Sequence, residues 1–196
     1  MFFVLSVCVS VVRAQINAPV PSNIGDPFGE AKERRSREAA LRSITMIGPN
    51  TRDPREQQAL LEQMNGDFRK IQIIRLGMIQ NIAAGKSFEY KRLADDSSEI
   101  KKRAARLKLA LALREDGGSD GPEPAPVEFG TDTIQNAASD LCLEISRFTT
   151  NPLFKEGAVY NIRYAKEADK TLETIIELSE NIKTSADKLR RSSREP

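Results

Sequence analysis

Histidine is absent from all 196 residues, and this absence excludes several kinds of catalytic and metal site. Ser-His-Asp and Cys-His catalysis need an imidazole as general base. Zinc sites of the His-Glu-x-x-His type, and di-iron bundles with Glu-x-x-His pairs, need it as a ligand. The composition does not exclude catalysis by carboxylates, lysine or tyrosine, but the sequence shows no recognisable arrangement of such catalytic residues. We therefore expect a protein that is not an enzyme, with no catalytic, cofactor-binding or metal-binding residues and no cofactor.

Tryptophan is also absent, and only 3 tyrosines are present, which argues against a surface that stacks on sugars or bases. The charge is nearly balanced, with 30 basic and 28 acidic residues. Domains that bind nucleic acid usually have a strongly basic surface. The composition therefore predicts no nucleic-acid partner.

Cysteine is scarce, since the chain has only Cys8 and Cys142. Cys8 lies in an N-terminal segment that we expect to be cleaved off, so no intramolecular disulfide framework remains. A free cysteine usually behaves as a small buried hydrophobic residue. We expect this role for Cys142; the alternative is a disulfide to a second chain.

The N-terminus resembles an export signal. The apolar run from Phe2 to Val12 is shorter than the roughly 20 residues that span a bilayer, but it fits the 7–15-residue core of a signal peptide. Val12 and Ala14 occupy the −3 and −1 positions of a cleavage site after Ala14. The sequence thus predicts a signal peptide at 1–14, cleaved on export to the periplasm or the exterior. The alternative is a strand or helix packed into the fold.

Residues 15–25 are uncharged and contain two prolines, so we expect an extended leader. Asp26-Pro27 is typical of a helix start, and the helix it opens should end at Gly48-Pro49. Only its second half carries closely spaced apolar residues: Ala40, Leu41, Ile44 and Ile47.

A first helical hairpin is predicted within 53–115. Asp53 and Glu56 have the spacing of a capping box, and the helix they open should run to about Ala84. Its apolar residues recur every three or four positions: Leu60, Met64, Phe68, Ile71, Ile74, Met78 and Ile82. Leu61, Ile73, Leu76 and Ile79 widen this stripe, which predicts neighbours on more than one side. Close contact with another helix would explain why glycine occurs at positions 66 and 77 inside this helix.

The second helix of this hairpin should follow the turn at Gly85 and run over about 87–115. Its main apolar row is Leu93, Ile100, Ala104, Leu107 and Leu111, and Leu109 and Leu113 form a second row. Asp95 to Ser98 are poor helix formers, so we expect a bend or break there.

Residues 116–130 are rich in glycine and proline and predict a flexible linker. A second hairpin follows at 131–191. Its first helix opens at Asp132 and carries Ile134, Ala138, Leu141, Ile145 and Phe148; Asn151-Pro152 closes it and is a candidate cap for the last helix. We expect a kink in the last helix near Gly157, and frayed residues at 192–196.

No segment has the alternation typical of a strand, so the predicted fold class is all-α. Two long antiparallel hairpins would form a four-helix-bundle-like or coiled-coil-like domain, with one shorter N-terminal helix at 26–47. Independent hairpins that complete their cores in an oligomer are the alternative.

The charged clusters are the remaining candidates for a phosphate-binding or metal-binding site. The densest basic cluster is Lys101, Lys102, Arg103, Arg106 and Lys108. We expect a solvated face that pairs with Asp95, Asp96 and Glu99, rather than a phosphate site. Adjacent helical residues such as Asp95 and Asp96 point about 100° apart, so we expect no metal there. The basic C-terminal residues are Lys188, Arg190, Arg191 and Arg194.

Together these features predict an exported, non-enzymatic helical protein that acts through protein–protein contacts or self-association. It would serve as an adaptor, a scaffold or an accessory subunit of the cell envelope. The alternative is a helical module that binds a small ligand or, through its basic C-terminal tail, a membrane surface. Each lysine or arginine near an acidic membrane contributes about 1 kcal/mol.

Overall fold

Five α-helices and one short 3₁₀ helix form the part of the chain that the computed structural model describes, which is residues 27–46, 53–111, 127–155 and 161–193. The elements are α1 (Pro27–Met46), α2 (Pro54–Ala83), α3 (Tyr90–Ala110), α4 (Ile134–Thr149), η1 (Pro152–Phe154) and α5 (Ile162–Ser192). No strand occurs in these residues. The predicted all-α fold class is confirmed.

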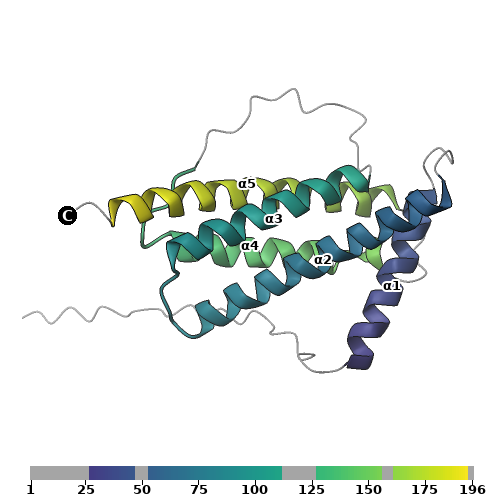
Figure 1. Ribbon diagram of the computed structural model, residues 1–196, viewed down its shortest axis with the longest axis horizontal. Helices are drawn as coiled ribbons and strands as arrows, with labels where there is room; N and C mark the ends of the chain where they lie inside the picture. The colour runs from purple at the N-terminus through teal and green to yellow at the C-terminus, as the bar shows by residue number, and fades with distance from the viewer. Residues whose placement is uncertain (1–26, 47–52, 112–126, 156–160, 194–196) are drawn as a thin grey trace, which may run out of the picture.

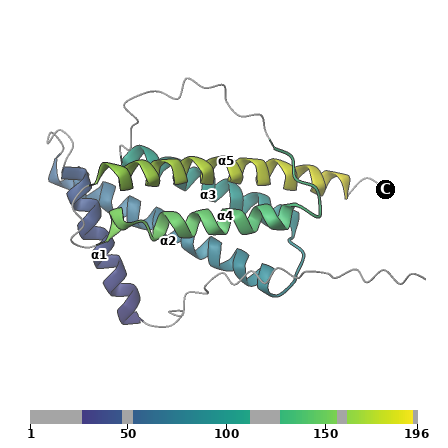
Figure 2. The ribbon, with the colours of Figure 1, turned by 180° about the vertical axis from the view of Figure 1, so that it is seen from behind.

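Helices α2 to α5 form a four-helix bundle (Figure 1). Each helix packs against two others: α3 against α5, α5 against α4, α4 against α2, and α2 against α3. The contact between α3 and α5 is the most extensive. Helix α1 lies across one end of the bundle and contacts α2 and η1, as both views show (Figures 1 and 2).

All neighbouring helices in the bundle are antiparallel. Between α3 and α5, Lys101 pairs with Glu180 and Lys108 with Glu173, so rising numbers in one helix meet falling numbers in the other. Helices α2 and α3 form one hairpin, and α4 and α5 the other. It follows that α3 and α4 run in the same direction, and that the end of α3 and the start of α4 lie at opposite ends of the bundle.

The segment before α4 is fixed against the C-terminal half of α5. The backbone N–H of Phe129 donates to Ser185 Oγ at 2.9 Å, and Glu128 forms an ion pair with Lys188. Leu111 and Val127 therefore lie near opposite ends of the bundle.

Most residues of the predicted apolar rows form the core, but Leu60 and Ile82 of α2 are only partly buried. The buried side chains include Met64, Phe68, Ile71, Ile74, Met78, Leu93, Ile100, Ala104, Leu107, Leu111, Ile134, Ala138, Leu141, Ile145 and Phe148. Three aromatic rings meet at the end covered by α1: Phe68 lies 5.0 Å from both Phe148 and Phe154. The guanidinium of Arg37 in α1 lies 5.1 Å from the centre of the Phe68 ring. Ala40 and Leu41 are also buried, so part of the predicted packing half of α1 is confirmed.

The predicted helix caps are partly wrong. Asp53 does cap α2, but its Oδ1 accepts from the N–H of Arg55 at 2.9 Å rather than from Glu56. Asn151 caps η1, accepting from the Leu153 N–H at 2.8 Å, whereas Asn161 caps α5. The chain turns after Asn151 because Leu153 and Phe154 enter the core.

Helix α3 is continuous from Tyr90 to Ala110, so the bend or break predicted over Asp95 to Ser98 is wrong. Ser97 is fully buried in this helix. Packing of α3 against α5 outweighs the low helix propensity of these residues, which costs only fractions of a kcal/mol each.

Two other predictions about packing are also wrong. Leu109 was placed in a second apolar row but is 84% exposed. At Gly66 and Gly77, no described atom lies within 4 Å of an added Cβ, so neither glycine serves a close helix contact within the chain.

Several predictions lie outside the described residues. They concern the signal peptide at 1–14, the leader at 15–25, residues 116–126 of the linker, the kink near Gly157 and the last three residues of the tail. Among the described helices, none has the length and apolar character needed to cross a membrane.

Candidate functional site

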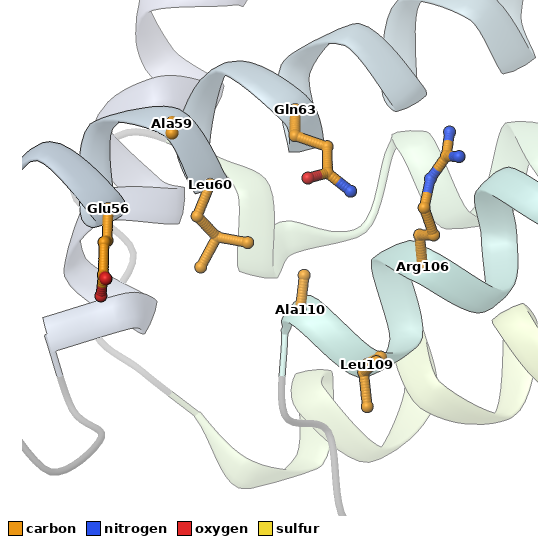
Figure 3. Close-up of a pocket in the computed structure, with 7 residues that line it drawn as sticks. All are labelled: Glu56, Ala59, Leu60, Gln63, Arg106, Leu109 and Ala110. Carbon is orange, nitrogen blue, oxygen red and sulfur yellow. The ribbon is translucent and has the colours of Figure 1, made fainter. Parts of the chain in front are cut away.

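A shallow, open groove lies between α2 and α3. It has a volume of about 580 Å³ and is lined by Glu56, Ala59, Leu60, Gln63, Arg106, Leu109 and Ala110. The first half of α2 contributes one wall and the last turns of α3 the other (Figure 3). The groove exists because positions three and four apart on each helix share one face.

The groove is apolar in the middle and polar at its rim. Leu60 and Ala110 point into the space between the helices, and Leu109 points outward beside it (Figure 3). Leu60 is only partly buried against the core, and Leu109 is 84% exposed. Glu56, Gln63 and Arg106 supply the polar groups. A lone exposed leucine is ordinary, but one beside an apolar groove is a candidate contact. The sequence does not predict this site, because Leu109 falls in a second apolar row beside the core row of the helix.

Arg106 is held in place by a buried carboxylate. Its Nε donates to Asp67 Oδ2 at 3.0 Å and its Nη2 to Asp67 Oδ1, and this pairing raises the pKa of Arg106 above its usual value. Arg103 also donates to Asp67, at 2.8 Å, and its Nε donates to Glu99 at 2.7 Å. The side chains at this wall of the groove therefore form a fixed, charge-compensated network rather than an open cationic site.

Two other residues of the basic cluster, Lys101 and Lys108, pair with α5. Lys101 donates to Glu180 at 2.8 Å, which lowers the pKa of that carboxyl. Lys108 lies 3.7 Å from Asp169 and pairs with Glu173. Burial lowers the pKa of Lys108, but these carboxylates outweigh burial and raise it overall.

The prediction of a solvated basic face is thus only partly right. The cationic side chains do pair with acids, but among the predicted partners only Glu99 takes part, through Arg103. The main partners come from α2 and α5, far away in the sequence. Asp95 is exposed, and Asp96 interacts weakly with Arg92 at 3.7 Å. Burial raises the pKa of Asp96 more than the charges of Arg92 and Lys70 lower it.

The acidic pair is not part of a larger acidic cluster among the described residues, and the cysteine is buried. In the described part of the chain, no three His, Cys, Asp or Glu side chains come together as a metal site would require. Cys142 is free and buried between α4 and α2, as predicted for a small hydrophobic residue. Burial raises the pKa of its thiol to about 12, although the charge of Arg75 acts in the opposite direction. The Arg75 Nε donates to the carbonyl oxygen of Cys142 at 2.8 Å.

Two of the basic side chains near the C-terminus have acidic partners. Lys188 pairs with Glu128, and Arg190 lies 3.1 Å from Asp187. Arg191 is exposed, whereas Arg194 lies outside the described residues. The end of α5 thus has less uncompensated positive charge than its sequence indicates.

Comparison with known proteins found no counterpart: no family model matches the sequence, no curated protein matches it, and no solved structure matches the fold.

Proposed function

We propose that this chain is an exported, non-enzymatic helical protein that binds a segment of another protein in the groove between α2 and α3. The observation that carries the proposal is the 84% exposure of Leu109 beside the apolar middle of this groove. Burying a leucine of this kind against a partner contributes about 1.5–3 kcal/mol. Contact with a partner would therefore stabilise a surface that now faces water.

The dimensions of the groove favour a short, apolar segment as its ligand. The lining residues of α2 run from Glu56 to Gln63, which is about two helical turns or roughly 10 Å. A partner helix would place apolar side chains against Leu60, Leu109 and Ala110. Because Arg106 is already neutralised by Asp67, an anionic ligand gains little from it. This supports an apolar peptide over a phosphorylated one.

The lack of histidine and the state of the nucleophilic groups support a non-enzymatic function. The thiol of Cys142 stays protonated at neutral pH, and Asp67 is occupied by two guanidinium groups. Export is supported by the sequence of residues 1–14 alone. The intact mass of the protein from its own cells tests export: a chain that starts at Gln15 is expected, and one that retains residues 1–14 would contradict it.

The contact is tested separately by site-specific photo-cross-linking in the cells that make the protein. A benzophenone side chain at Leu109 is expected to give one adduct of defined mass. The same probe at Glu177, an exposed position of α5, should not give that adduct. An adduct of twice the chain's own mass at Leu109 would show self-association through the groove instead, and would contradict the proposal.

A pair of variants tests whether the partner binds in the groove itself or on the surface around it. Ala59→Arg fills the groove, so the yield of the Leu109 adduct should fall about tenfold, as expected when a well-packed contact is lost. Gln58→Arg introduces the same side chain at the adjacent exposed position, which does not line the groove, and should leave the yield unchanged. Equal yields in both variants would reject the groove as the binding site.

A further inference from the structure

The outer face of the second half of α2 has an apolar surface without a partner among the described residues. We call Ile73, Leu76, Gly77, Gln80, Ala83 and Ala84 the α2 outer face. Ile73 is 50% exposed, and nothing described lies within 4 Å of a Cβ built at Gly77. The second half of α2 runs along the lower edge of the bundle in both views (Figures 1 and 2), and Gln80, Ala83 and Ala84 are also exposed.

No described residue packs closely against the glycine on this face. A glycine inside a helix costs about 1 kcal/mol relative to alanine. The space above Gly77 is empty among the described residues, which leaves room for the backbone of a second molecule to approach closely. Gly66 has the same free space, so the charges around the patch, and not the glycine, decide the choice of partner.

The α2 outer face is also uncharged. Between Lys70 and Lys86, the only charged residue is Arg75, and its guanidinium points toward α4, where it donates to the carbonyl oxygen of Cys142. This neutrality matters for the choice of partner. In a two-fold dimer each surface meets itself, so a patch with charges of one sign repels its copy, whereas a neutral apolar patch does not.

We propose that two copies of this chain associate through the α2 outer face, with their α2 helices antiparallel around a two-fold axis near Leu76 and Gly77. In this register, position i of one helix faces position 153 − i of the other, so Arg69 faces Ala84 and Lys70 faces Ala83. A parallel arrangement would instead place Arg69 beside Arg69 of the second copy. The charges that flank the patch therefore select the antiparallel register.

This dimer goes beyond the proposed function and does not rest on it, because the groove and the α2 outer face involve different residues. The patch spans 12 residues, from Ile73 to Ala84, which is roughly 18 Å of helix. Stable interfaces usually bury about 800 Å² on each partner, and one helix pair provides less. The dimer should therefore form reversibly with concentration.

Sedimentation velocity of the purified protein, over roughly 1 to 300 µM, tests the association; this range brackets a weak interface of small area. The mass is expected to rise from one chain to two. Ile73→Glu should weaken the association at least about tenfold, because in this register each new carboxylate is buried opposite the uncharged Gln80 of the other copy. Leu109→Glu is the matched control: it replaces another exposed apolar residue, and the dimer should persist. A monomer at all concentrations, or a dimer unaffected by Ile73→Glu, would overturn the proposal.

Cysteine cross-linking tests the register. Gly77→Cys should form a disulfide between two copies on mild oxidation, since position 77 lies next to the axis. Gly66→Cys should not, because position 66 would face position 87, beyond the end of α2 at Ala83. Both sites have free space for the new side chain, and Cys142 is too buried to compete. Equal cross-linking of the two variants, or none, would contradict the antiparallel register.

Discussion

At the scale of single residues, Cys142 is the side chain whose chemistry is most altered by the fold. Its thiol is buried, and this burial raises its pKa to about 12, because a thiolate would lose its hydration. The thiolate is the nucleophile in alkylation and disulfide exchange. Cys142 therefore acts as a small packing residue between α2 and α4.

This leads to a prediction about alkylation. At pH 8, native Cys142 should react with iodoacetamide about 1,000-fold more slowly than the same residue in urea, because the thiolate fraction falls tenfold for each unit of pKa. The rate can be followed by intact mass. As a control, Leu143→Cys in a Cys142→Ser background introduces a thiol at a 47% exposed neighbour, which should react at the ordinary rate. Equal rates in the native and denatured protein would contradict the assigned burial.

At the scale of helices, charged contacts fix how α3 lies against its neighbours. Asp67 of α2 is buried and accepts from Arg103 and Arg106, which are three residues apart on α3. An unpaired carboxylate buried at this position would destabilise the fold, because it has lost its hydration. The two guanidinium groups compensate that cost only while α2 and α3 keep this register.

The expected result of breaking this network is a large loss of stability. Arg103→Met combined with Arg106→Met should lower the free energy of unfolding by about 3 kcal/mol, since Asp67 is then buried without a partner. Adding Asp67→Leu should restore most of the loss. Urea denaturation measures both values. If the triple variant is as unstable as the double variant, the loss comes from packing and not from the uncompensated charge.

The sequence predicts the positions of the helices better than it predicts the contacts between them. The spacing of three and four residues identifies core positions such as Phe68, Leu107 and Leu141, because burial follows the period of the helix. The pairing of Arg106 with Asp67 could not be predicted, since it depends on the register between helices. Leu109 was placed inside for a related reason: a widened apolar row does not say where the neighbouring helix ends.

At the scale of the whole molecule, the order of the helices constrains the connection between the hairpins. Helices α3 and α4 run in the same direction, so Leu111 and Val127 lie near opposite ends of the bundle. With 21 residues, α3 is about 31 Å long. An extended chain covers about 3.3–3.6 Å per residue. At least nine residues are therefore needed to make the connection.

Shortening this connection should prevent folding of the single chain only below a minimum length. Deleting residues 117–121 leaves ten connecting residues and should change the free energy of unfolding by less than about 0.6 kcal/mol, because closure entropy depends weakly on loop length. Deleting residues 115–124 leaves five, which is too short, so the chain should unfold or exchange hairpins between copies. Denaturation and sedimentation measurements distinguish these outcomes. A folded, monomeric short variant would contradict the described helix order.

The place of α5 in the bundle also determines when the protein can fold during its synthesis. Helix α5 follows all the other described helices in the sequence, yet it packs against both α3 and α4 and makes the most extensive contact of the fold with α3. A growing chain that ends before Ile162 thus exposes the apolar face of α3, including Ile100 and Ala104. The bundle can close only after α5 has emerged from the ribosome, and until then the exposed apolar face of α3 favours aggregation of the nascent chain.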